Sequence, residues 1–130
     1  AAQALLGTAS FAGDVAGVRR ALVHGADPNQ KAFDWYGTMG AGNRTAVIVA
    51  AGHGKLQGTL HVLRFLLAAA GADPNIDAGS SGHRSSSGKA TPCFWACHKR
   101  RHDCVRVLLA LGATPDHSMS CTCPGDIKYL

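Results

Sequence analysis

The five residues Gly25–Asn29 read GADPN, the same five letters return at Gly71–Asn75, and a variant, GATPD, stands at Gly112–Asp116. Glycine enters the left-handed backbone conformation that ends many helices, and the Asp and Pro that follow it turn the chain. A segment with apolar residues at helical spacing precedes each copy. These segments are Gly13–His24, Leu60–Ala70 and His102–Leu111. The sequence therefore predicts three helices, each closed by the same turn.

A second, shorter helix is predicted ahead of each of these three. Thr45 and Thr91 are typical N-cap residues, and Pro92 fits the first helical turn, where a missing N–H costs little. Each short segment also carries a pair of small residues that permits close helix packing: Ala9/Ser10, Ala50/Ala51 and Ala96/Cys97. The predicted short helices are Leu5–Gly13, Thr45–Gly54 and Thr91–Arg100. The chain thus repeats one unit, helix-turn-helix, three times.

Composition limits the class of protein. A chain of 130 residues with 46% hydrophobic residues can form one domain with its own core, and its apolar runs are too short to span a bilayer. The chain opens on Ala1-Ala2 without methionine, so we expect an excised domain. Five cysteines without an export signal favour reduced thiols and an intracellular protein, cytoplasmic or nuclear. The net charge of +5 permits contact with nucleic acid or with acidic proteins and requires neither.

The third unit, Thr91–Asp116, resembles the ankyrin repeat in its Thr-Pro, its Ala-plus-small pair, its Val-Leu-Leu run and its Gly-Ala turn. The second unit matches the same pattern with extra residues between its helices, and the first matches from Ala9 to Asn29. The resemblance implies a single all-α ankyrin-repeat solenoid over residues 1–130, with about three helix-turn-helix units at about 1–29, 44–75 and 90–116 and a tail at 117–130. Ankyrin units recur at about 33 residues. Because these turns lie 46 and 41 residues apart, the inter-repeat loops are enlarged.

A narrower resemblance rests on the segment Trp35–Ala51, which contains Trp35-Tyr36-Gly37, then Arg44-Thr45 and an Ala-Ala helix. It resembles the ankyrin region of plant-type tandem CCCH zinc-finger proteins. This implies a full-length RNA regulator whose zinc fingers lie outside these 130 residues.

The ankyrin resemblance implies a monomeric, non-catalytic module without a cofactor that binds a protein partner through its concave face and its loops. The predicted partner-binding residues are Trp35, Tyr36, Arg44, His53, Lys99, Arg100 and Arg101. The aromatic residues of the loop Gln30–Asn43 are either exposed interface anchors or a lid folded back on the inner helices. The alternatives to protein binding are direct nucleic-acid binding by the basic surface and masking of a neighbouring domain.

Several other motifs receive a structural interpretation. Cys93, Cys97 and Cys104 lie near His98 and His102, yet their register matches buried apolar positions, so we predict core packing and no metal. We interpret Gly52–Lys55 as an inter-helix turn rather than a phosphate loop, and we find no catalytic arrangement. Cys121 and Cys123 in the tail could contribute to a metal site completed elsewhere, but we favour two exposed thiols. The loop Ile76–Ala90 has linker composition, and Ser85, Ser86 and Ser87 after Arg84 suggest phosphorylation by a basophilic kinase.

Overall fold

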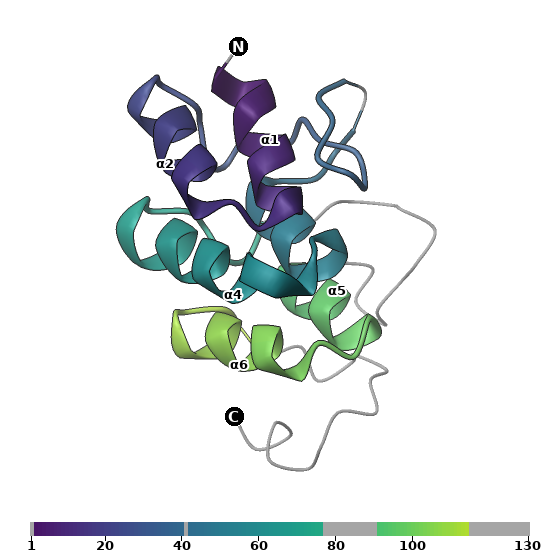
Figure 1. The fold of residues 1–130 in the computed structure, drawn as a ribbon. Coiled ribbons are helices and arrows are strands. Elements are labelled where there is room, and N and C mark those ends of the chain that lie inside the picture. Colours follow the sequence, from purple (N-terminus) through teal and green to yellow (C-terminus); the bar gives the residue numbers. More distant parts are fainter. Residues whose placement is uncertain (1, 41, 77–90, 115–130) are drawn as a thin grey trace.

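The chain folds into three stacked pairs of helices (Figure 1). The computed structural model describes residues 2–40, 42–76 and 91–114. The first pair is α1 (Ala2–Ala12) and α2 (Val15–Val23), and the third is α5 (Pro92–His98) and α6 (His102–Ala110). In the second pair, α3 (Ala46–Ile48) continues into the π-helical turn η1 (Val49–His53), and α4 (Leu56–Arg64) continues into the π-helical turn η2 (Phe65–Ala69). Within the described ranges the only β-structure is a pair of isolated bridges from Phe33.

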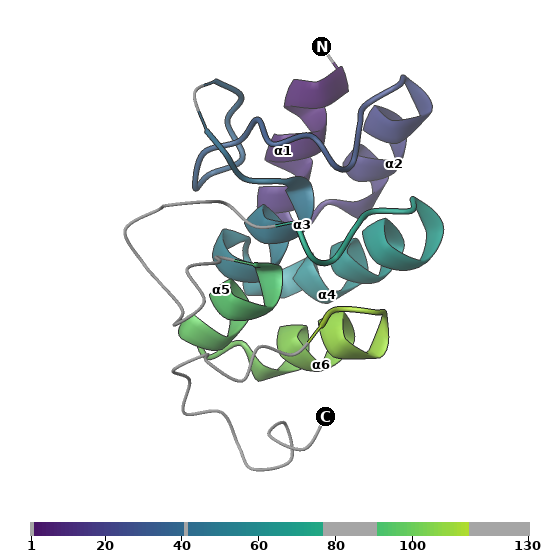
Figure 2. The ribbon, with the colours of Figure 1, turned by 180° about the vertical axis from the view of Figure 1, so that it is seen from behind.

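The helices form two layers, which Figures 1 and 2 show from opposite sides. One layer, here called the inner layer, contains α1, α3 with η1, and α5; the outer layer contains α2, α4 and α6. Within the inner layer η1 contacts both α1 and α5, and within the outer layer α4 contacts both α2 and α6. The predicted all-α solenoid of three helix-turn-helix units is therefore confirmed.

The core lies between the layers and continues from one unit to the next. Equivalent apolar positions of the outer helices are fully buried, namely Val18, Val62 and Val105. The small pairs of the inner helices are buried as well, as their close packing requires: Ala9, Ser10, Ala50, Ala51, Ala96 and Cys97. Burial of such apolar surface is the main force that stabilises each unit against its neighbours.

Side chains cap the helix starts where the sequence predicts it. The Thr45 hydroxyl accepts a hydrogen bond from the Ile48 N–H at 3.3 Å, and the Thr91 hydroxyl accepts one from the Phe94 N–H at 3.2 Å. The Asp14 carboxylate does the same for the Gly17 N–H at 3.1 Å at the start of α2. Each bond satisfies a backbone donor that the first helical turn leaves unpaired.

The repeated GADPN turn links each unit to the next one. Within a copy, the Asp73 carboxylate accepts from the Asn75 N–H at 2.9 Å, and the first copy has the same bond. Between copies, the Asn29 side-chain oxygen accepts from the Asp73 N–H at 2.7 Å, and the Asn75 oxygen accepts from the Thr114 N–H at 2.8 Å. The recurring Asn therefore pairs with the backbone of the following turn, which explains why Asn returns at this position.

The π-helical turn η1 provides a second link between units. The Ala50 carbonyl accepts a hydrogen bond from the buried Thr59 hydroxyl at 2.5 Å. It also accepts one from the Arg101 Nη1 at 3.3 Å, which reaches across from the third unit. Three kinds of contact thus hold the stack together: the shared apolar core, the Asn hydrogen bonds between turns, and the hydrogen bonds to the Ala50 carbonyl.

Candidate functional site

The loop between the first two units, residues 30–43, has a defined structure around Phe33. The Phe33 side chain is fully buried. Its backbone exchanges two hydrogen bonds with Arg44, each 3.1 Å long, so the two ends of the loop are paired. The Asp34 carboxylate then accepts from the Tyr36 and Thr38 N–H groups, both at 2.9 Å. These bonds fix the tip of the loop.

The loop packs directly on α1 because a glycine leaves room for it. A Cβ added at Gly7 would lie 2.1 Å from the Gly37 carbonyl oxygen and 2.5 Å from the Phe33 ring. Gly37 itself has φ 78°, a left-handed conformation that favours glycine. The Tyr36 ring rests edge-on against Phe11 of α1, with ring centroids 5.6 Å apart. The loop is therefore held to the first unit on one side.

On its other side the loop enters a cluster of cations and aromatic rings. The Arg44 guanidinium carbon lies 4.6 Å from the Trp35 ring centroid and 5.3 Å from that of Trp95 on α5. His53, at the end of η1, lies 4.5 Å from Trp35 and 5.0 Å from Trp95. The Lys99 ammonium lies 5.5 Å from the Trp35 centroid. Cation–π attraction of this kind is worth about 0.5–2 kcal/mol for each contact, depending on burial.

Four of the seven predicted partner-binding residues therefore meet in this cluster: Trp35, Arg44, His53 and Lys99. They come from the loop 30–43, the second unit and the third unit, and Trp95 of the third unit joins them. The sequence did not indicate Trp95 as a partner-binding residue, and its side chain is fully buried. A repeat alignment that pairs Thr45 with Thr91 also pairs His53 with Lys99, so the spacing contains a signal for their proximity.

Trp35 and Tyr36 of the loop differ in how far they are exposed. Trp35 is 36% exposed and contacts His53 of η1 and Trp95 of α5, so it covers part of the inner layer as a lid would. Tyr36 is 67% exposed, so most of its side chain is not part of this lid. Met39, which the sequence did not single out, is 43% exposed on the same loop. An apolar surface of Tyr36, Met39 and the outer part of Trp35, here called the loop surface, thus faces solvent.

Arg44 is not the surface contact that the sequence predicted. It is only 5% exposed. Burial lowers the pKa of Arg44, and the Asp34 carboxylate partly opposes this effect. Its Nη1 donates to Asn43 at 3.3 Å, whereas its Nε has no hydrogen-bond partner among the described residues. Arg44 therefore positions Trp35 and Trp95 and does not itself present a charge to a partner.

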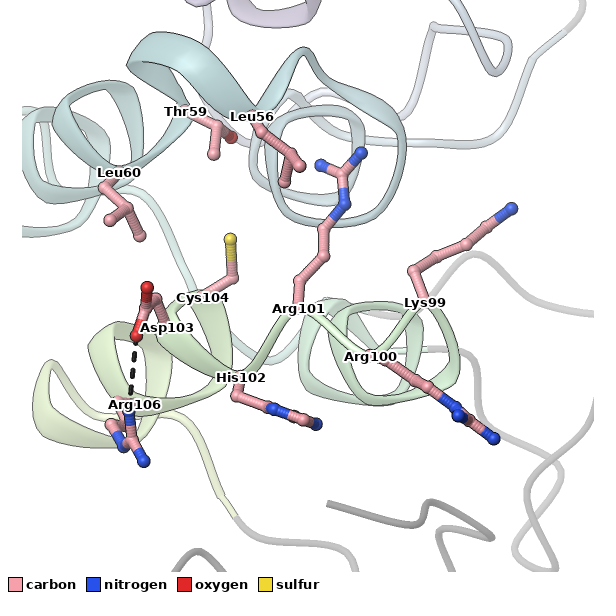
Figure 3. A pocket seen from close by; sticks show the side chains of 10 residues that line it. All are labelled: Leu56, Thr59, Leu60, Lys99, Arg100, Arg101, His102, Asp103, Cys104 and Arg106. Carbon is pink, nitrogen blue, oxygen red and sulfur yellow. Dashed lines mark hydrogen bonds and ion pairs between the residues drawn. The ribbon is translucent and has the colours of Figure 1, made fainter. Parts of the chain in front are cut away.

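The last two predicted residues, Arg100 and Arg101, follow Lys99 at the turn between α5 and α6. Lys99, Arg100 and Arg101 occupy this turn, and with α4 they line a cavity of about 630 Å³ (Figure 3). Burial lowers the pKa of the Arg101 guanidinium. Burial also raises the pKa of the neighbouring Cys104 thiol to about 11. The charge of Arg101 opposes this rise, and the Asp103 carboxylate adds to it. This cavity is the second candidate site.

The cysteine and histidine residues near α5 belong mostly to the interior. Cys93, Cys97 and Cys104 are all buried, as their register predicted. Cys97 is disulfide-bonded, so the expectation of reduced thiols is wrong for this cysteine. In the part of the chain that the structure describes, no group of three His, Cys or Asp side chains could hold a metal ion. Gly52–Lys55 forms the end of η1 and the turn into α4, as interpreted from the sequence.

Some predictions concern residues outside the described ranges, namely Ser85, Ser86, Ser87, Cys121 and Cys123. None of the helices described is long and apolar enough for a membrane span.

Comparison with known families agrees with the stacked architecture. A family model described as "Ankyrin repeats (3 copies)" matches residues 5–119. No curated protein matches the chain. Because the family model covers most of the sequence and all three helix pairs, the chain belongs to the ankyrin-repeat family.

Proposed function

We propose that this chain is a non-catalytic module that binds a protein partner through the loop surface and the cations beside it. Ankyrin repeats are generally protein–protein interaction modules. The observation that carries the proposal is the loop itself, because a rigid loop exposes Tyr36 and Met39 while Trp35 ties it to the inner layer. Aromatic side chains held in this way are the residues that dominate binding energy at interfaces.

The charge beside the loop surface favours an acidic partner segment. Lys99 lies next to Trp35, and Arg100 and Arg101 follow it in the turn. The chain carries 13 Lys and Arg residues against eight acidic residues. Complementary charge speeds encounter and selects partners, whereas the apolar anchor supplies most of the affinity.

Affinity capture tests the proposal. The domain and its Tyr36→Ala variant are immobilised and exposed to a cell lysate with and without nuclease, and the retained proteins are identified by mass spectrometry. We expect a protein that survives nuclease and is lost on Tyr36→Ala. A Val23→Ala variant is the matched control, because Val23 is an exposed apolar residue (82%) on the outer layer. If every captured protein disappears on nuclease treatment, direct nucleic-acid binding replaces the proposal.

A second proposal, on the complete protein to which this chain belongs, rests on Trp35-Tyr36-Gly37 and the segment that follows it. We propose on this basis that the complete protein is an RNA regulator with zinc fingers, in which this chain recruits partners or masks a neighbouring domain. The complete coding sequence tests this proposal: CCCH motifs in the same reading frame support it, and a complete frame without them rejects it.

A further inference from the structure

The cavity at the turn between α5 and α6 has one aliphatic wall and one cationic wall. Leu56 and Leu60 of α4 form the aliphatic wall, together with the Thr59 methyl side (Figure 3). The opposite wall is the turn and the first residues of α6. In Figure 3, Arg101 extends from the turn toward α4, whereas Arg100 extends away from α4.

The cavity carries an excess of positive charge that the described residues do not compensate. Four cations line it, Lys99, Arg100, Arg101 and Arg106, against a single carboxylate. That carboxylate, Asp103, is already paired with Arg106 at 3.2 Å. Lys99, Arg100 and Arg101 therefore have no carboxylate partner in the described part of the chain.

Comparison with the first unit shows that two of these cations occupy positions where the local backbone favours other residues. The Arg100 N–H bonds to the Cys97 carbonyl and the Arg101 N–H to the Ala96 carbonyl. In the first unit Gly13 and Asp14 make the equivalent bonds, to Ser10 and Ala9. The shared bond pattern makes Arg100 equivalent to Gly13 and Arg101 equivalent to Asp14.

The consequences are specific to each position. Arg100 has φ 59°, the left-handed conformation that Gly13 adopts at 75° without a steric cost. Arg101 stands at the N-cap of α6, where Asp14 caps α2, and its side chain caps nothing. A basic residue at this end of a helix is also disfavoured by the helix dipole. Arg100 and Arg101 therefore add positive charge to the cavity, and each lowers the stability of the turn that carries it.

A phosphate group is the ligand chemistry that fits this cavity. Its three acceptor oxygens and its charge of about −2 suit several donors at once. The Arg101 guanidinium donates from Nη1 to the Ala50 carbonyl and has further N–H groups that can bind a phosphate. The aliphatic wall suits an apolar side chain next to the phosphate. Nucleic acid fits less well, because the described residues that line the cavity include no Phe, Tyr or Trp on which a base could stack, and His102 offers only its small imidazole ring.

We propose that this cavity binds a phosphorylated serine or threonine of a protein partner, with an aliphatic residue beside it against Leu56 and Leu60. The inference rests on the proposed protein-binding function and adds the chemistry of the partner. Lys99 lines the cavity and also contacts Trp35, so one partner segment can reach both the cavity and the loop surface.

Fluorescence anisotropy tests the proposal with the intact chain. The probes are two fluorescein-labelled peptide libraries with degenerate flanks, one with a fixed central phosphoserine and one with serine. We expect the phosphoserine library to bind at least about tenfold more tightly and inorganic phosphate to compete. Charged hydrogen bonds to Arg101 carry most of this difference, so Arg101→Gln should weaken binding about tenfold or more. Arg64→Gln, an exposed cation of α4 outside the cavity, is the matched control and should leave binding unchanged.

A second variant separates lost binding from lost folding. Arg100→Gly removes a cation and relieves the left-handed strain, so we expect weaker phosphoserine binding together with a higher thermal unfolding midpoint. Equal binding of both libraries, or no binding of either, overturns the proposal, and so does tighter binding of a labelled single-stranded RNA. If phosphoserine binding fails but the affinity capture still retains a nuclease-resistant protein, only the phosphate proposal is overturned and the proposed protein-binding function stands. Failure of the phosphate proposal can therefore be distinguished from failure of the proposed function.

Discussion

Removal of the Asn75 side chain tests the hydrogen bond that joins the second unit to the third. In Asn75→Ala the Thr114 N–H loses its acceptor at 2.8 Å, while the Asp73 bond to the Asn75 backbone remains. A net intramolecular hydrogen bond contributes about 0.5–1.5 kcal/mol, and this donor is exposed, so water replaces part of the loss. We therefore expect the free energy of unfolding to fall by about 1 kcal/mol, which corresponds to roughly 3–6 °C in Tm.

Removal of the Asn29 side chain, which joins the first turn to the second, should lower the free energy of unfolding by the same amount. In Asn29→Ala the Asp73 N–H loses its acceptor at 2.7 Å. Because the two bonds share no donor or acceptor atom, the double variant should lose about 2 kcal/mol. Urea unfolding followed by the fluorescence of Trp35 and Trp95, the two tryptophans of the chain, measures these changes.

An aspartate separates the hydrogen bond from other effects of the substitution. Asn75→Asp keeps a side-chain oxygen at the acceptor position, and the third turn carries Asp116 at this place in the sequence. This variant should keep most of the stability that Asn75→Ala loses. Equal losses in the two variants, or no loss in Asn75→Ala, would refute the reasoning about the inter-unit bond.

Three further predictions concern packing, strain and pH. Gly52→Ala should destabilise by about 1–3 kcal/mol in urea unfolding, because the added Cβ would lie 2.8 Å from the Trp95 Cβ; an unchanged midpoint would contradict this packing. Arg100→Gly should raise the free energy of unfolding by about 0.5–1 kcal/mol, measured in the same way, since glycine tolerates φ 59°; a loss of stability would argue against strain. Cys104 has its pKa raised from 9.0 to about 11 by burial, so the unfolded chain ionises first as pH rises. Stability should therefore fall by up to about 2–3 kcal/mol between pH 9 and pH 11, and Cys104→Ala should remove this component of the pH dependence.

Much of the fold could be predicted because its determinants are local. The N-caps at Thr45 and Thr91 and the helix-ending glycines each depend on residues within one turn of the chain. The register of the repeats then places Val62 and Val105 at equivalent buried positions. Local signals of this kind are readable without an alignment because the chain repeats them.

The candidate site depends on contacts between distant residues, and these were harder to predict. A basic residue in a glycine-rich loop is ordinarily exposed, yet Arg44 is buried because Trp35 and Trp95 cover it from two units. Likewise, the loop rests on α1 because Gly7 lacks a side chain, and nothing near residue 37 in the sequence indicates this. The left-handed Arg100 follows from a turn geometry that its own residue type disfavours.

Site-specific photo-crosslinking at position 36 tests the central claim most directly. A photoreactive benzoylphenylalanine replaces Tyr36 in one sample and the exposed outer-layer residue Val23 in the other, and both are irradiated in nuclease-treated lysate. The loop surface predicts a discrete protein crosslinked from position 36 and absent from position 23. The same crosslinks from both positions, or no protein from position 36, would contradict the claim that this loop is the partner-binding surface.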